Sequence, residues 1–192
     1  MGGASRRMGK PKAQIKLSGQ TILERVRAKL TPLCREIILV TNQPTDFLEY
    51  DLEIVQDLIP GRGPLGGLAT GLLHAHYPWA LVLACDLPFV KLPLLDYLAQ
   101  KALAAPPGPR AVIPRHSAGW EPLVAVYSKS CLKPAHKLLS LKNSRINDLK
   151  NCGVFFEFVP EGELLKLDGQ LLSFVNLNTP EDLERAKKLL AE

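Results

Sequence analysis

The sequence has no long apolar run: a membrane-spanning helix needs about 18 consecutive apolar residues, and no such stretch occurs. Its glycine-rich, basic start also lacks the apolar segment of a secretory signal. Cysteine is scarce and forms no C-x-x-C pair, which argues against a zinc site or a disulfide framework. The four cysteines are Cys34, Cys85, Cys131 and Cys152. These absences predict a cytoplasmic chain with no membrane partner.

The composition is otherwise that of an ordinary globular protein, with 46% hydrophobic and 22% charged residues in a chain of 192. These values exclude a disordered, collagen-like or coiled-coil protein. The length is sufficient for one domain with a solid core. No repeat, low-complexity segment or domain linker interrupts the sequence, so we expect a single domain over residues 1–192.

The basic charge is concentrated at one end of the sequence. The formal net charge is +5, and the first sixteen residues hold five basic residues and no acidic one, so the rest is balanced. A surface that binds nucleic acid would spread its excess along a face or a helix. The clustering therefore favours a site for one polyanion and argues against a nucleic-acid partner. A solvated basic tail is the alternative.

Short apolar runs alternate with helical patterns along the chain, which predicts an α/β fold. We expect a mostly parallel, Rossmann-like sheet with helices on both faces, in three layers α/β/α. Continuous apolar runs are typical of strands covered on both faces. They lie at 36–41, 52–56, 79–85, 110–114, 123–127, 154–159 and 171–175. Helices are predicted by a capping box at Thr21, by an N-cap at Thr179 before Pro180, and by apolar patterns at 65–76 and 93–104.

Polar residues directly follow three of the predicted strands: Asn42, Asp57 and Asp86. Ligands of such sheets bind beyond the carboxyl ends of the strands, so we expect these residues at one edge. For Asn42 and Asp57 a role in turn formation is the alternative, because their side chains bond to nearby backbone. For Asp86 a ligand-binding role is favoured, since an unpaired carboxylate beside a buried strand is costly.

Two glycine motifs indicate different phosphate chemistry. Gly61–Gly66 has the form G-x-G-x-x-G of a dinucleotide fingerprint, with Asp86 twenty residues beyond it. The residues Asp57–Pro60 separate it from the preceding strand, whereas the fingerprint needs a tight turn, so we favour close backbone approach as the role of these glycines. Gly2–Lys12 is not a Walker A loop, because Pro11 stands where a Ser or Thr is required. Its backbone N–H groups, arginines and lysines instead suit a triphosphate.

The first loop, G-G-A-S-R-R-M-G-K-P-K, resembles the nucleotidyltransferase signature G-G-x-S-x-R-M-G-x-x-K. Later segments resemble one branch of that superfamily, the molybdenum cofactor guanylyltransferases. These segments are Q-D-L from Gln56, G-P-L-G-G from Gly63, C-D-L-P-F from Cys85, E-P-L-V-A from Glu121 and N-L-N-T-P-E-D-L from Asn176. The match runs from residue 2 to the C-terminus and implies the nucleotidyltransferase fold.

The resemblance implies that the glycine loop wraps the phosphates of GTP. Gly2 and Gly3 match the paired glycines of the family motif. Arg7 matches the arginine of R-M-G, and Lys12 matches the lysine that ends the motif. Both cations would act in catalysis by offsetting charge on the leaving pyrophosphate.

Residues at the strand ends match further parts of the nucleotide site of this family. Asn42 matches an asparagine near the base or ribose, and Asp57 matches the acid before G-P-L that is associated with nucleotide binding. Asp86 matches the acid that holds Mg²⁺, and is thereby implied to be catalytic and nucleotide-binding. The implied cofactor is Mg²⁺.

Two other segments match the side of the family that binds the acceptor. Glu121 and Pro122 fall where the family presents a loop toward the pterin substrate, although this glutamate is unusual there. Asn176 and Asn178 match an N-x-N pair that returns to the active site near the metal and the acceptor phosphate.

The reaction implied is attack by the terminal phosphate of the molybdopterin cofactor on the α-phosphorus of GTP, with release of pyrophosphate. Such a nucleophile is already anionic near neutral pH and needs no general base. We therefore expect the histidines to be structural or exposed; they are His74, His76, His116 and His136. Molybdenum-insertion proteins and apo-molybdoenzymes are further implied partners. Alternatives are a cytidylyltransferase on the same cofactor, a dinucleotide-binding oxidoreductase and a non-catalytic cofactor-binding relative.

One part of the family pattern has no counterpart in the sequence. In the family an apolar strand precedes the glycine loop and lies in the middle of the sheet. Here Met1 directly precedes Gly2, so the usual first strand is missing. Open ladder hydrogen bonds inside a sheet are costly. We therefore expect a start that was assigned wrongly or truncated, rather than a fold that works without this strand.

Overall fold

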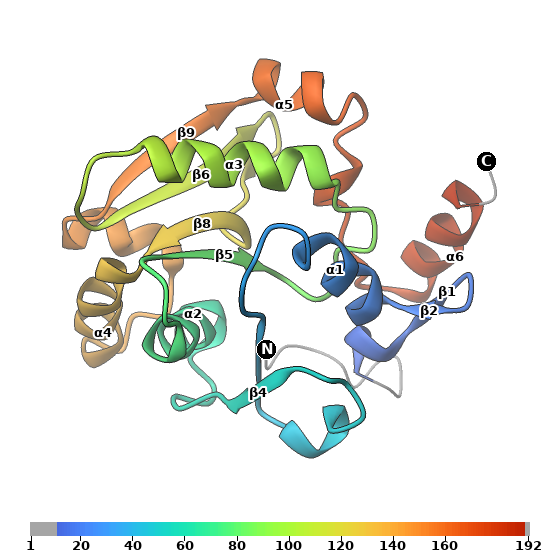
Figure 1. Cartoon of the computed structure of the whole chain (residues 1–192), viewed down its shortest axis with the longest axis horizontal. Helices are drawn as coiled ribbons and strands as arrows, with labels where there is room; N and C mark the ends of the chain where they lie inside the picture. The colour runs from blue at the N-terminus through green and yellow to red at the C-terminus, as the bar shows by residue number, and fades with distance from the viewer. Residues whose placement is uncertain (1–10, 191–192) are drawn as a thin grey trace.

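The computed structural model describes residues 11–190 and shows a mixed α/β fold with both faces of its main sheet covered by helices (Figure 1). Its main sheet contains β5 (Trp79–Leu83), β8 (Val124–Ser128), β6 (Arg110–His116) and β9 (Phe155–Pro160), in that order. The short strand β7 (Gly119–Trp120) forms a hairpin with β6. No helix within residues 11–190 is long and apolar enough to span a membrane.

The strands of the main sheet run mostly in one direction, as the sequence predicts. β6 and β9 are parallel, and β5 points the same way, because both β5 and β6 are antiparallel to β8. The reversed strand β8 is the exception that the sequence did not indicate. It follows β6 through the hairpin formed with β7, and a hairpin joins antiparallel neighbours.

A second, smaller ladder pairs β3 (Ile38–Thr41) with β4 (Glu53–Gln56) in parallel. Within residues 11–190 no ladder joins β3 to β5. The apolar residues of β3 and β5 are only partly buried, whereas all five residues of β8 are buried. A further small hairpin joins β1 (Lys16–Leu17) and β2 (Gln20–Thr21).

Helices cover both faces of the main sheet, which confirms the three-layer arrangement. The helices are α1 (Ile22–Leu30), α2 (Gly63–His74), α3 (Leu92–Ala104), α4 (Leu132–Ser140), α5 (Glu161–Leu167) and α6 (Pro180–Leu189). Figure 1 shows α3 and α5 on one side of the sheet and α2 and α4 on the other. Side chains alternate accordingly along β6: Val112 joins the core under α3, while Ala111 and Ile113 join the core over α2.

The helix starts expected from the sequence are confirmed at α1 and α6. Thr21 and Thr179 each accept a backbone N–H three residues ahead, from Glu24 and Asp182. The side chain of each acid accepts the N–H of its threonine in return, which completes a capping box. These reciprocal bonds satisfy donors that a helix start otherwise leaves open.

The strand predicted at 171–175 is wrong. Leu172–Phe174 form a 3₁₀ turn, and Leu171 before it has a φ of 52°. The buried carboxylate of Asp168 accepts the N–H of Ser173 at 2.7 Å, so this N–H is bonded within the turn and is unavailable to a ladder. A side chain that bonds to nearby backbone in this way competes with regular secondary structure.

Candidate active site

Three residues that lie far apart in the sequence meet at the carboxyl end of β5. The ammonium of Lys12 lies 3.2 Å from Asp86 Oδ2 and 2.5 Å from Asn178 Oδ1. Asp86 follows β5, and its carbonyl accepts the N–H of Leu177 at 3.0 Å, which fixes Asn178 beside it. The structure thus brings together a lysine, an acid and an asparagine that the sequence analysis selected from separate motifs.

Lys12 and Asp86 are largely shielded from water, whereas Asn178 is exposed, and the cluster has unused hydrogen-bonding capacity. The side chains of Lys12 and Asp86 are 13% and 19% exposed. The second carboxylate oxygen, Asp86 Oδ1, is buried and accepts no hydrogen bond from the part of the chain that the structure describes. A buried oxygen without a donor is costly, so the geometry suits a bound cation or donor at this position.

The donor set fits Mg²⁺ held jointly with phosphates. Within residues 11–190 no group of three or more His, Cys, Asp or Glu side chains forms a metal cage. Mg²⁺ is commonly bound by one or two carboxylates and completed by substrate phosphates and water. Asp86 and the amide oxygen of Asn178 supply that kind of partial shell.

Asp57, at the end of β4, is a buried carboxylate with partners from its own neighbourhood. Its Oδ1 accepts the N–H of Ile59 at 3.0 Å and the hydroxyl of Thr70 at 3.2 Å. Thr70 belongs to α2, and its hydroxyl oxygen also accepts the N–H of Leu58. The Asp57 N–H donates to Thr41 O of β3, so the residue ties β3, the loop after β4 and α2 together.

The glycines that follow Asp57 shape this loop, as expected from the sequence. Gly61 and Gly63 have φ values of 79° and 57°, in the region that favours glycine. A Cβ on Gly66 would lie 3.0 Å from the carbonyl oxygen of Ile59, so only glycine allows this close approach without a shift. The backbone conformation therefore explains the glycines of Gly61–Gly66 without a bound dinucleotide.

Asn42 follows β3 and lies next to Thr41, which accepts the Asp57 N–H. Its Oδ1 is buried and has no hydrogen-bond partner within residues 11–190. Asn42 and Asp57 thus follow the two strands of the smaller ladder, and Figure 1 shows β4 on the side of β5 away from β8. Their roles toward a nucleotide stay predictions. Gly2, Gly3 and Arg7 lie outside the described residues.

Glu121 and Pro122 stand on the opposite flank, between β7 and β8. The N–H of Ala84 donates to Leu123 O at 2.9 Å, which extends the pairing of β5 with β8 and places Glu121 near the strand end that carries Asp86. Burial raises the pKa of the Glu121 carboxyl above its usual value, and a hydrogen bond with His116 offsets part of that effect.

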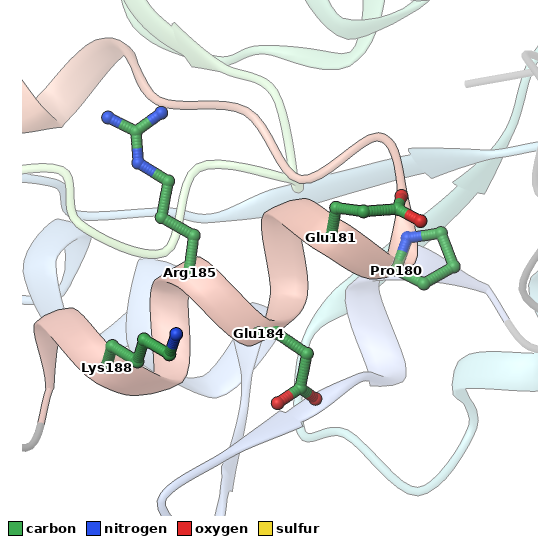
Figure 2. A pocket seen from close by; sticks show the side chains of 5 residues that line it. All are labelled: Pro180, Glu181, Glu184, Arg185 and Lys188. Carbon is green, nitrogen blue, oxygen red and sulfur yellow. The ribbon is translucent and has the colours of Figure 1, made fainter.

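Two of the remaining features contribute less to the site. Asn176 is exposed on the same segment as Asn178, and the cluster at Lys12 reaches only the latter. Figure 2 shows a hollow elsewhere that is lined from α6 alone, by Pro180, Glu181, Glu184, Arg185 and Lys188. None of its lining residues belongs to the cluster at Asp86.

Two residues that contact the candidate site residues were not predicted from the sequence. Thr70 anchors Asp57, and no pattern in the sequence pairs a helix interior threonine with an acid thirteen residues earlier. His116 was expected to be structural or exposed, and its contact with Glu121, a residue selected for the acceptor side, was not predicted. Only the proximity of these two residues in sequence, five apart, hinted at a contact.

Comparison with solved structures supports the fold. A 2-C-methyl-D-erythritol 4-phosphate cytidylyltransferase from Thermus thermophilus superposes with a TM-score of 0.71 over 95% of both chains, at 18% identity. At that identity the likeness shows the fold alone. Molybdopterin-guanine dinucleotide biosynthesis protein A from Archaeoglobus fulgidus reaches a TM-score of 0.82 and 31% identity, over 99% of this chain and 95% of the other.

Sequence comparison then gives the family. The model of the MobA-like NTP transferase domain matches residues 1–149, and the chain belongs to this family. A probable molybdenum cofactor guanylyltransferase from Pelotomaculum thermopropionicum is 34% identical, over 97% of this chain and 88% of that protein. The molybdenum cofactor guanylyltransferase from Desulfosudis oleivorans is also 34% identical, over 97% of this chain and 91% of that protein. The resemblance found in the sequence motifs is thereby confirmed.

Proposed function

We propose that the protein transfers GMP from GTP to the terminal phosphate of the molybdenum-molybdopterin cofactor, giving molybdopterin guanine dinucleotide and pyrophosphate. The observation that carries this proposal is the meeting of Lys12, Asp86 and Asn178 at one strand end. It supplies a cation for phosphates and oxygen ligands for a metal in one place. The names of the relatives support the guanine nucleotide and the molybdopterin acceptor.

The proposed reaction makes one bond to phosphorus and breaks one. An oxygen of the acceptor phosphate forms the new P–O bond to the α-phosphorus of GTP. The bond from that phosphorus to the oxygen bridging to the β-phosphate breaks, and pyrophosphate leaves with the bonding electron pair. No proton has to be removed from an anionic phosphate, so the chain needs to supply position and charge compensation rather than a base.

Lys12 supplies positive charge next to the reacting phosphates. Its ammonium is held by Asp86 and Asn178, which orient it with little freedom. Arg7, Gly2 and Gly3 are proposed to complete the phosphate loop on the basis of the sequence motif alone. Asn42 and Asp57 are proposed to bind the nucleoside portion, and Asn176 to act with Asn178 near the acceptor phosphate.

Asp86 and Asn178 are proposed to hold Mg²⁺. Bound there, this ion would neutralise charge on the phosphate oxygens as a Lewis acid. Asp86 has one oxygen free of hydrogen bonds within residues 11–190, so it can accept a cation without first losing its bond to Lys12. This arrangement predicts that added EDTA abolishes turnover and that excess Mg²⁺ restores it.

The test of the proposal is pyrophosphate release by the purified chain with molybdenum-molybdopterin and GTP, CTP or ATP. We expect release with GTP, and a loss of roughly a hundredfold in Lys12→Ala, as is typical when a group that stabilises transition-state charge is removed. Lys16→Ala is the matched control, because it removes the same charge from an exposed position of the same basic segment. A preference for CTP would show that CTP, and not GTP, is the nucleotide donor. No pyrophosphate release with any nucleotide would contradict the proposal.

A further inference from the structure

His116 and Glu121 form a built pair outside the cluster at Lys12. The Nε2 atom of His116 lies 3.0 Å from Glu121 Oε1, and its Nδ1 lies 3.2 Å from the N–H of Ala118. Because the backbone N–H can only donate, Nδ1 acts as the acceptor. A neutral ring therefore carries its proton on Nε2 and donates it to the carboxylate.

The histidine ring is held firmly in this orientation. It stacks on Phe174 with a centroid distance of 5.0 Å and an interplanar angle of 29°. Its side chain is only 9% exposed. Since the ring is fixed from two sides, one oxygen of the Glu121 carboxylate is fixed with it, and the orientation of the other oxygen follows.

The pair lies on one defined flank of the site. Ala84 and Leu123 join the end of β5 to the start of β8, so Glu121 stands on the β8 side of Asp86. Figure 1 shows β4, which Asp57 follows, on the side of β5 away from β8. Phe174, under the histidine, begins the segment that leads to Asn178. The pair and the cluster at Lys12 are thus connected through one short stretch of chain.

The position beside the phosphates restricts what this carboxylate can bind. A carboxylate only accepts hydrogen bonds, and it repels a phosphate brought close to it. The Glu121 carboxylate suits the uncharged edge of a ring that carries an N–H and an amino group side by side. Its two oxygens can each accept a hydrogen bond from one of these donors. Such an edge, a 2-amino-4-oxopyrimidine, occurs in guanine and in a pterin.

We propose that His116 is a positioning residue that holds Glu121 to recognise the 2-amino-4-oxopyrimidine edge of the pterin acceptor. The inference rests on the proposed function, which supplies a pterin as the second substrate. The flank decides between the two rings, because the guanine of GTP is assigned to the side of Asn42 and Asp57, which are proposed to bind the nucleoside. Asn42 and Asp57 occupy one flank, and His116 and Glu121 occupy the other.

The test separates the two substrates by steady-state kinetics of pyrophosphate release. Glu121→Gln replaces one acceptor oxygen by a donor of the same shape. We expect its KM for the acceptor to rise by about tenfold to a hundredfold, as for the loss of a hydrogen bond to a charged group, with KM for GTP unchanged. An unchanged KM for the acceptor, or a rise in KM for GTP instead, would overturn the inference.

Two substitutions of His116 separate positioning from packing. His116→Phe keeps an aromatic ring on Phe174 and removes the donor, so we expect it to raise KM for the acceptor in the same sense as Glu121→Gln. His116→Gln keeps a hydrogen-bond donor for Glu121 and loses the stacking on Phe174. We expect its KM for the acceptor to lie closer to the wild-type value than that of His116→Phe. The reverse order of these two variants, with thermal unfolding showing both folded, would assign His116 to packing and overturn its role.

Failure of the proposed function gives a different result. If the wild-type chain releases no pyrophosphate from GTP, the pair is tested by fluorescence quenching of a phosphorylated pterin titrated with protein. Weaker binding to Glu121→Gln than to the wild type would support the pair. Equal binding, or no binding to either protein, would overturn it.

Discussion

Two acids that each follow a strand, Asp57 after β4 and Asp86 after β5, are in opposite situations. Asp57 is engaged by its own surroundings, since Oδ1 accepts hydrogen bonds from Ile59 and Thr70. Asp86 has one oxygen without a partner in the described chain and shares the other with Lys12, 74 residues away. The comparison teaches that an acid after a strand can stabilise a loop or remain available to a ligand, and that its hydrogen-bond partners distinguish the two.

Asp86→Asn should produce the largest effect. The substitution keeps the shape of the side chain and removes the charge that pairs with Lys12 and would hold a cation. We expect turnover to fall by roughly a hundredfold or more, in line with losses of other charge-stabilising groups. Pyrophosphate release measures this, and activity near the wild-type value would remove Asp86 from the reaction.

Asp57→Ala should act on stability. It leaves the N–H of Ile59 and the hydroxyl of Thr70 without their acceptor, at a cost of about 1–3 kcal/mol for each buried group left unsatisfied. Urea denaturation measures the free energy of unfolding. Asp57→Asn is the matched control, because it keeps an oxygen that can accept both bonds. Equal stability of the alanine variant and the wild type would contradict the anchoring role.

The loop that Asp57 anchors can be tested with two neighbouring glycines of α2. A Cβ on Gly66 meets Ile59 O at 3.0 Å and Arg62 Cβ at 3.2 Å, whereas one on Gly67 meets no atom of residues 11–190 within 4 Å. Gly67→Ala should stabilise the helix by about 0.5–1 kcal/mol. Gly66→Ala should cost about 1–3 kcal/mol through overpacking. Thermal unfolding of both variants checks the opposite signs, and a stabilised Gly66→Ala would contradict the close approach.

The smallest expected effect concerns a third acid, Asp168. Burial alone would raise the pKa of its carboxyl, but hydrogen bonds from Ser173 and Lys91 outweigh burial and hold the pKa below the ordinary value. The resulting stabilisation is present above the unfolded pKa of about 3.9 and is lost as the pH falls through the lower folded pKa. Acid titration of unfolding should therefore show a loss below about pH 4 that is smaller in Asp168→Asn. Identical acid profiles would contradict this.

Much of the fold was predictable because its signals are local. Continuous apolar runs located β3, β4, β5, β6, β8 and β9, and the threonines at 21 and 179 located the starts of α1 and α6. The direction of β8 was not predictable from its own residues, since it depends on the hairpin that precedes it. The segment 171–175 is apolar like a strand, but the N–H of Ser173 donates to the Asp168 carboxylate and is not available to a neighbouring strand.

The candidate site was predictable to the extent that its members belong to motifs. Lys12, Asp86 and Asn178 were each selected from separate segments, and the structure brings them together. No motif contained the hydrogen bond from Thr70 to Asp57 or the contact between His116 and Glu121. Both depend on how side chains meet after folding.

The most direct test of the difference between Asp57 and Asp86 is the stabilisation of the purified chain by Mg²⁺ with GTP. A ligand at a hundred times its Kd should add about 2.7 kcal/mol to the free energy of unfolding, seen as a shift of a few degrees in Tm. We predict that the shift occurs in the wild type, is smaller in Asp57→Asn, which changes one group proposed to bind the nucleoside, and is lost in Asp86→Asn. A full shift in Asp86→Asn would contradict the account, because the open carboxylate would then hold no part of the ligand.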